Sequence, residues 1–322
     1  MPSSTDIIGH ESQIEALRSD IASDNVAHAY LFAGKPHLGK FTVAKWFARE
    51  LLTSDARDDA DRTQLLREID RLLHPDLLVI DQLWMEDICE DFDVLAKSSN
   101  VPQQHRAKAG AKTDTISVDD VRALQDRLHE VSTGRFRCCL IRGAERMQAE
   151  AVNTLLKIVE EPPPGVVFLL TTESASALLP TLVSRSRVVR FSPVPLPLLT
   201  SLVADASTDD AQFLLRLAQG APGIILRMKA DPDALRLERQ QYASALAFWH
   251  ASSLAERLQL LKPLEAKGED AQRFLLHLAL ALREERGDAL SDRAAALHGL
   301  LRNLKTNASR PLLAQKFAME VG

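Results

Sequence analysis

The chain has 322 residues, of which 46% are hydrophobic and 26% charged, so it can form two or three folded domains and shows no overall signature of disorder. A formal net charge of −5 excludes a protein that coats nucleic acid by itself, although it leaves room for a local basic patch. The amino terminus has no basic segment before an apolar core, and no run of about 18 apolar residues occurs. We therefore expect a cytoplasmic chain without membrane contact.

Residues 7–22 have the apolar spacing of an amphipathic helix, and residues 30–33 have the pattern of a short buried strand. The strand leads into a loop with the P-loop spacing G-x-x-x-x-G-K, in which Phe41 stands where a P-loop has serine or threonine. Gly34, Gly39 and Lys40 are the candidate nucleotide-binding residues, because such loops surround phosphates with backbone N–H groups and a lysine. A match of this length also arises by chance, so the loop alone does not establish binding.

Between this loop and the centre of the chain, the sequence predicts a charged helix at 53–74, a strand at 77–80, a mobile loop at 84–115 and a helix from Ser117 to Gly134. Ser117 and Asp120 have the capping-box spacing. The apolar face of the last helix is predicted to contain Val121, Leu124, Leu128 and Val131. His74 has no second histidine or cysteine at ligand spacing, so it is interpreted as a loop residue and not as a metal ligand.

Two apolar runs, 138–141 and 166–170, predict neighbouring strands of a parallel sheet, because strands covered on both faces are continuously apolar. The helix between them has Ala151, Leu155, Leu156 and Val159 on one stripe and ends at a run of three prolines. A short helix and a basic turn at 184–187 are predicted to follow. This βαβ unit predicts an α/β fold with a parallel sheet.

Three catalytic positions of a P-loop ATPase are altered. Phe41 cannot bind Mg²⁺, and the Asp-Glu pair that normally ends a neighbouring strand is replaced by Arg142 and Gly143. We therefore expect an empty or weakly occupied nucleotide site and no hydrolysis. Glu160 and Glu161 are adjacent on a helix and do not converge, so they are interpreted as surface or packing residues and not as a catalytic pair.

Cysteine usage predicts neither a disulfide framework nor a zinc site. Two of the three cysteines, Cys138 and Cys139, are adjacent in a predicted strand, where neighbouring side chains point to opposite faces. The third, Cys89, lies in the predicted loop. No metal ligands are expected.

Five segments together are similar to the clamp-loader branch of the AAA+ proteins, and in particular to its bacterial members, which belong to the DNA polymerase III holoenzyme. They are HAYLFAGKPHLGK, HPDLLVID, ISVDDVRALQDRL, AERMQAEAVNTLLKIVEEPPPGVVFLLTT and LLPTLVSRSRVVRF, and with LAQGAPGIILRM the resemblance covers about residues 5–230. Many bacterial relatives have a four-cysteine zinc module after the P-loop helix, but this chain has no cysteine between Lys40 and Asp81.

The resemblance implies a hetero-pentameric ring in which ATP lies between neighbouring subunits and drives the sliding clamp onto primer–template DNA. It implies ATPase and clamp-opening subunits as partners, with clamp and DNA reached through the complex. The family's Ser-Arg-Cys motif corresponds to Ser184-Arg185-Ser186, which makes Arg185 the candidate arginine finger for a neighbour's ATP. The alternative for Arg185 and Arg187 is a pair of surface salt bridges.

By the same resemblance, residues 1–192 are an ATPase-like core, 193–230 a small helical lid and 231–322 an all-helical collar that holds subunits together. The implied role is a rigid stator subunit without ATPase activity of its own. Two rivals stay open: an ATP-hydrolysing motor subunit of the same machine, and an AAA-like adaptor outside replication.

Overall fold

The computed structural model describes residues 7–71, 74–80, 115–285 and 290–321. The chain divides into two compact units, the first formed by residues up to 204 with 219–223 and the second by 205–218 with the residues from 224 onward. In this division the segment expected to form a lid, 193–230, contributes to both units. The loop expected at 84–115 lies, apart from Thr115, outside the described residues.

A parallel five-stranded sheet organises the first unit, in the order β2-β3-β4-β1-β5. The strands are β1 Ala29–Ala33, β2 Leu77–Ile80, β3 Arg137–Ile141, β4 Val166–Thr172 and β5 Arg187–Arg190. Every residue of β1 to β4 is buried, as the continuous apolar runs predict. The predicted α/β class with a parallel sheet is confirmed.

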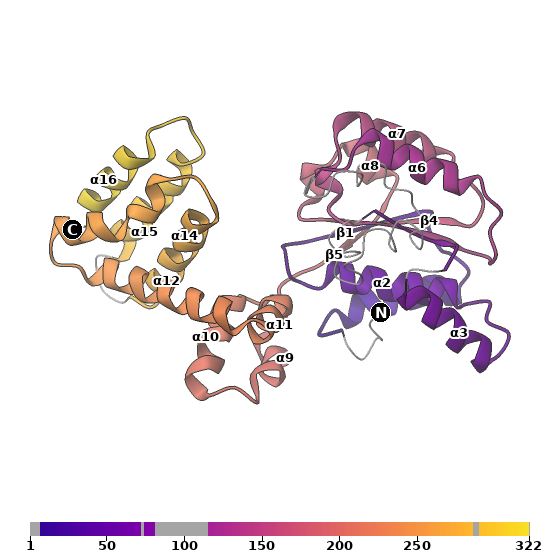
Figure 1. The fold of residues 1–322 in the computed structure, drawn as a ribbon, viewed down its shortest axis with the longest axis horizontal. Coiled ribbons are helices and arrows are strands. Elements are labelled where there is room, and N and C mark those ends of the chain that lie inside the picture. Colours follow the sequence, from indigo (N-terminus) through magenta and orange to yellow (C-terminus); the bar gives the residue numbers. More distant parts are fainter. Residues whose placement is uncertain (1–6, 72–73, 81–114, 286–289, 322) are drawn as a thin grey trace. The chain divides into compact units, whose positions relative to one another are not determined.

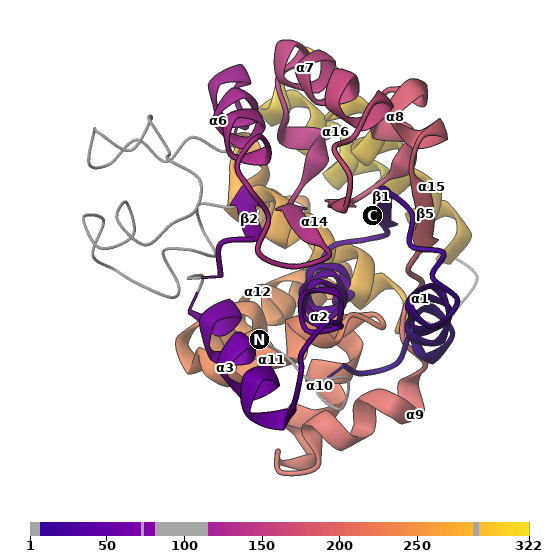
Figure 2. The same ribbon diagram turned by 90° about the vertical axis from the view of Figure 1, so that its right-hand side faces the viewer.

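Helices cover both faces of this sheet (Figures 1 and 2). One layer contains α1 Glu11–Ala22, α2 Lys40–Leu52 and α3 Asp59–Asp70, and the other contains α6 Val118–Leu128, α7 Ala149–Glu160 and α8 Pro180–Ser184. Adjacent strand residues pack into different layers: Cys139 belongs to the core under α6 and α7, whereas Cys138 lies against the Ala48 carbonyl of α2. The smaller elements are η3 Ala144–Arg146, η4 Ala175–Ala177, α9 Leu196–Leu199 and η5 Thr200–Val203.

The start of α6 was predicted correctly but its end was not. Ser117 and Asp120 form the expected capping box, which satisfies two backbone N–H groups at the helix start. The helix stops at Leu128, six residues before Gly134. Val131, which was assigned to the apolar face of this helix, is instead 92% exposed in the loop that follows.

The last strand, β5, was missed by the sequence interpretation, which placed Arg187 in a basic turn. Its sequence RVVR has only two apolar residues, and its side chains are exposed or half-buried because it lies at the edge of the sheet. Pairing with β1, which aligns Tyr30 with Arg187 and Ala33 with Arg190, defines the strand.

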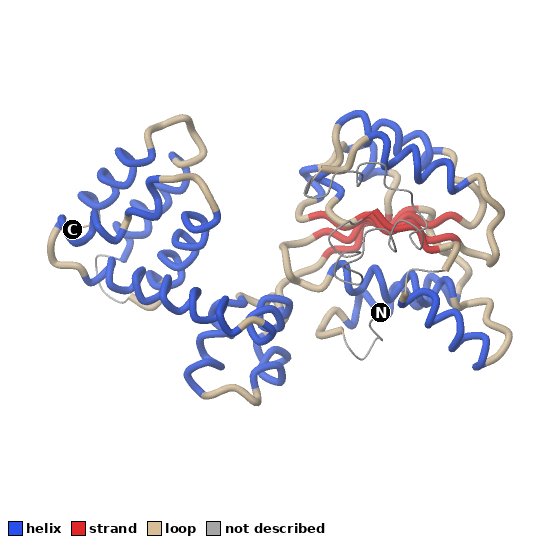
Figure 3. Tube along the Cα trace, in the orientation of Figure 1, coloured by secondary structure: helices blue, strands red, loops and turns tan. Residues whose placement is uncertain are grey.

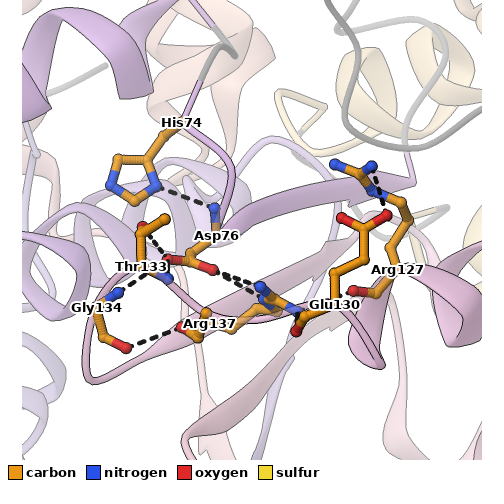
Figure 4. A network of polar contacts seen from close by, with 8 residues as sticks. His74, Asp76, Arg127, Glu130, Thr133, Gly134 and Arg137 are labelled. Atoms are coloured by element: carbon orange, nitrogen blue, oxygen red, sulfur yellow. Dashed lines mark hydrogen bonds and ion pairs between the residues drawn. The ribbon is translucent and has the colours of Figure 1, made fainter.

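A buried ion pair fixes the loop between α6 and β3 (Figure 4). Asp76 and Arg137 are almost fully buried, and the guanidinium of Arg137 lies 2.8 Å from the Asp76 carboxylate. The carboxylate also accepts hydrogen bonds from the backbone N–H groups of Thr133 and Gly134. Arg137 in turn donates to the carbonyl of Arg127, in the last turn of α6, and to that of Glu130, in the loop that follows. One ion pair therefore satisfies both the end of the helix and the loop.

This network predicts an acid-dependent loss of stability. Burial alone would raise the pKa of the Asp76 carboxyl, but hydrogen bonds from Thr133 and Arg137 and the charge of Arg137 outweigh it and hold this pKa below its usual range. Because the folded pKa is below the unfolded value of about 3.9, the carboxylate stabilises the fold fully above that value. The contribution is lost as the pH falls through the folded pKa.

Urea unfolding of the wild-type chain and Asp76→Asn across pH 3–7 measures this contribution. We expect the difference in unfolding free energy to be constant above about pH 5 and to narrow below about pH 4. A difference at pH 3 as large as at pH 7 would contradict the assignment.

Over its described residues, the second unit consists of helices and the loops that connect them (Figure 3). Its helices are α10 Thr208–Ala218, α11 Pro222–Ala230, whose first two residues belong to the first unit, α12 Pro232–His250, α13 Leu254–Leu260, η6 Lys262–Glu265, α14 Glu269–Leu282, α15 Leu290–Asn303 and α16 Arg310–Glu320. Phe248 and Trp249 are buried in the core of this unit. The Phe248 ring stacks on Phe317, the Trp249 ring meets Phe317 edge-on, and the Trp249 indole donates to the Leu278 carbonyl. Among the described helices, none is long and apolar enough to cross a membrane.

Candidate functional site

The P-loop segment connects the carboxyl end of β1 with the amino end of α2, the strand–loop–helix context that the motif requires. It borders an open cleft of about 730 Å³, within the usual size range of ligand sites. The cleft is lined by Pro36, His37, Gly39, Lys40, Phe41, Thr42, Lys45, Arg142, Gly143, Glu145, Arg146, Thr171, Thr172, Glu173 and Gly223. The structure thus brings two of the predicted nucleotide-binding residues to the same cleft as the altered catalytic positions.

The backbone geometry of the fold itself requires glycine at both glycine positions of the motif. A Cβ at Gly34 would lie 2.6 Å from the Phe191 carbonyl oxygen, and the Gly34 N–H donates to the Thr172 carbonyl of β4. Gly39 begins α2 with φ of 92°, a left-handed conformation that side chains disfavour. Their presence is therefore explained without a bound phosphate.

Lys40 is turned back onto its own loop. Its ammonium donates to the carbonyls of Gly34 at 2.5 Å and Lys35 at 2.6 Å, and the residue is only 9% exposed. Burial lowers the pKa of this amine, while the carboxylates of Glu173 and Glu145 act in the opposite direction. A phosphate that approached Lys40 would have to replace two hydrogen bonds that the loop already provides.

Phe41 and Arg142, two of the altered catalytic positions, contact each other. The Arg142 guanidinium lies 5.3 Å from the centre of the Phe41 ring, and the Lys45 ammonium lies 5.2 Å from it. Both are cation–π distances. The side chains of Phe41, Arg142 and Lys45 thus form a cation–π cluster that lines the cleft. The sequence alone showed each substitution but not that the two are joined.

The opposite wall of the cleft is made by the ends of β3 and β4. Thr171 accepts a hydrogen bond from the Gly143 N–H at 3.0 Å, and Glu145 accepts one from the Glu173 N–H at 3.3 Å. Thr171 therefore joins two strand ends, in keeping with a structural role. Over the described part of the chain, no group of three or more histidine, cysteine, aspartate or glutamate side chains is arranged to hold a metal ion.

We expect the isolated chain to show no saturable binding of Mg-ATP at concentrations up to about 1 mM, the weak end of ordinary substrate affinity. Lys40 is already hydrogen-bonded, and Arg142 opposes a divalent cation beside Phe41. Calorimetric titration tests this, and ATP with EDTA is the control that separates exclusion of the metal from exclusion of the nucleotide. A micromolar dissociation constant for Mg-ATP would refute the expectation.

Arg185 lies apart from this cleft, directly after α8. Its guanidinium forms an ion pair of 2.9 Å with Glu160 at the end of α7 and donates to the Thr181 carbonyl at 3.2 Å. Its side chain is 38% exposed. Arg187 pairs with the buried carboxylate of Asp20 at 2.6 Å. Both arginines therefore make ion pairs inside the chain, and only Arg185 pairs with a carboxylate that is itself exposed.

The partner of Arg185 was not foreseen from the sequence. Glu160 had been weighed only against its neighbour Glu161, because adjacent carboxylates are what a sequence shows. Its contact with Arg185 joins residues 25 positions apart through the packing of α7 on α8. The proline run after α7 and the short helix before Arg185 were the available signals, but neither fixes a side-chain contact.

Comparison with known proteins identifies the family to which the chain is similar. A family model described as DNA polymerase III, delta subunit, matches residues 9–195. The tau subunit of DNA polymerase III from Escherichia coli is 29% identical over 186 residues, which are 56% of this chain and 24% of that protein. The delta' subunit from Bacillus subtilis is 25% identical over 185 residues, again 56% of this chain and 47% of that protein. The matches therefore cover less than half the length of either relative.

Among solved structures, a DNA polymerase III gamma subunit-related protein from Thermotoga maritima has a similar fold, with a TM-score of 0.54 and 19% identity. The similarity covers 96% of this chain and 98% of that one. At this identity the similarity shows a shared fold.

Proposed function

The chain belongs to the DNA polymerase III delta subunit family, and on that premise we propose that it is a delta-prime-type stator subunit of a clamp loader. In this role it helps place the sliding clamp on primed DNA and supplies Arg185 to the ATP site of a neighbouring subunit. It hydrolyses no ATP itself, because Phe41, Arg142 and Gly143 replace the metal-binding and water-orienting groups.

The observation that carries the proposal is the position of Arg185 relative to its own P-loop. Strands β1 and β5 are parallel, with Tyr30 beside Arg187 at the start of β5. The P-loop begins at Gly34, four residues further along β1, which corresponds to about 13 Å of strand. Arg185 precedes β5, so it lies at the amino ends of the parallel strands, whereas the P-loop lies at their carboxyl ends. An arginine in that position can act on a nucleotide only if another chain provides the nucleotide.

The partners follow from the same role. We propose that ATPase subunits and a clamp-opening subunit assemble with this chain in a hetero-pentamer through its carboxy-terminal helices. Sliding clamp and primer–template DNA are then reached through the complex. The 193–230 lid and the 231–322 collar are part of this proposal.

Two other functions compete with it. A motor subunit of the same machine would bind and hydrolyse Mg-ATP alone, which the packed contact between Phe41 and Arg142 disfavours. An adaptor outside replication would not assemble with clamp-loader subunits, and the family match disfavours that.

The test of the proposal is reconstitution with tau-type and delta subunits from the same organism. We expect the chain to co-elute with them and to raise their DNA-stimulated ATP turnover, while the chain alone turns over no ATP. Failure to co-elute supports the adaptor, and turnover by the chain alone supports the motor.

A further inference from the structure

The ion pair between Glu160 and Arg185 joins two elements whose backbones are held by one core. Val159, next to Glu160 in α7, is 1% exposed, and Leu182 of α8 is fully buried in the same hydrophobic cluster. We infer that Glu160 is a positioning residue, which holds the Arg185 guanidinium in the orientation that a neighbouring subunit's nucleotide requires. This inference rests on the proposed function of Arg185, and it adds Glu160 as the residue that orients the arginine.

The position of Glu160 is unfavourable for its own helix. It is the last residue of α7, where the helix dipole favours a cation and disfavours a carboxylate. Glu161 follows as the C-cap residue, so two carboxylates lie at the helix end where the dipole disfavours them. The Glu160 carboxylate instead has a partner outside the helix, the guanidinium of Arg185.

Arg185 is held from two directions. Glu160 contacts its guanidinium from α7, and the Thr181 carbonyl, one turn back in α8, accepts one of its N–H groups. An arginine side chain has many rotamers, and fixing them in advance lowers the entropy lost when it meets a phosphate. The side chain is still 38% exposed, so its outer edge remains open to a ligand.

The pair is too exposed to serve mainly for stability. The side chains of Arg185 and Glu160 are 38% and 46% exposed, and exposed ion pairs contribute little to folding. The nearby Arg187–Asp20 pair contrasts with it, because the Asp20 side chain is only 5% exposed and also accepts the Tyr30 hydroxyl. An exposed ion pair of this kind adds little to stability, but it can hold the Arg185 side chain in one orientation.

The experiment compares Glu160→Gln with Glu161→Gln in the reconstituted complex. Both remove one carboxylate charge from the end of α7, but only the first contacts Arg185. We expect Glu160→Gln to lower kcat for DNA-stimulated ATP turnover by up to about fivefold, the range of an exposed ion pair. The KM for ATP should not change, because the ATP-binding residues belong to the neighbour. Glu161→Gln should leave both parameters at wild-type values.

The double variant Glu160→Gln/Arg185→Ala separates this inference from the proposed function. If Glu160 acts through Arg185, the double variant turns over ATP at the rate of Arg185→Ala alone. Wild-type kcat for Glu160→Gln, with a loss for Arg185→Ala, overturns the inference and leaves the finger intact. No loss for Arg185→Ala overturns the proposed function itself. Failure of Glu160→Gln to co-elute with its partners also overturns the inference, because the residue would then act in assembly.

Discussion

Arg185→Ala is expected to slow ATP hydrolysis at the site that receives this arginine by about 10³- to 10⁵-fold, the range found for arginine fingers. The guanidinium stabilises negative charge on the transferred phosphoryl group, and alanine removes that charge without touching the core, since Arg185 is exposed. The measurement is DNA-stimulated ATP turnover by the reconstituted complex, with co-elution as the check that the complex has formed. If the intact complex that contains Arg185→Ala turns over ATP at the wild-type rate, Arg185 is not an arginine finger.

Arg187→Ala is the matched control. Arg187 is two residues away and 42% exposed, close to the 38% of Arg185, but it pairs with the buried Asp20. Its removal leaves a buried carboxylate without its cation, so we expect lower stability and turnover within about twofold of wild type once the complex has formed. Arg185→Lys adds a second comparison, because lysine keeps the charge and loses the planar fork that binds phosphate oxygens.

Arg137→Met is expected to lower the free energy of unfolding by about 3–5 kcal/mol, because it leaves Asp76 as an uncompensated buried charge. The same change removes the guanidinium donors to the carbonyls of Arg127 and Glu130, which adds to the loss. Since a domain is stable by about 5–15 kcal/mol, the loss is a large share of the total. Urea unfolding followed by circular dichroism measures it.

The double variant Asp76→Asn/Arg137→Met tests the cause. Removing the second charge should recover part of the loss, since asparagine still accepts the N–H groups of Thr133 and Gly134. A double variant as unstable as the sum of both single ones would show that the two residues act independently. A single Arg137→Met variant within about 0.5 kcal/mol of wild type, the range of ordinary surface substitutions, would show that the pair has no role in stability.

The interior of the sheet could be predicted because its sequence is unambiguous. The apolar runs 77–80 and 166–170 are continuous, as in buried parallel strands, and a capping box such as Ser117 with Asp120 is a local signal. That Phe41 and Arg142 stand at positions where a P-loop ATPase has Mg²⁺ ligands was also visible in the sequence, since residue identity decides it.

What the sequence could not show depends on contacts between distant segments. β5 is defined by its pairing with β1. The loop beyond Leu128 is held by Arg137, which donates to the Glu130 carbonyl, and by Asp76, which accepts the Thr133 N–H. The stacking of Arg142 on Phe41 and the pairing of Glu160 with Arg185 likewise join residues far apart in the chain. No local pattern encodes these pairs.

Arg185 and the P-loop lie at opposite ends of the parallel strands, so the two ends of the sheet present different surfaces to neighbouring subunits. Subunits that meet through two different ends join head to tail, and each junction can contain one nucleotide. In the proposed assembly, a chain that cleaves no ATP beside Phe41 and Arg142 contributes only its Arg185 end to a working junction. The junction at its P-loop end is then one at which no ATP is cleaved.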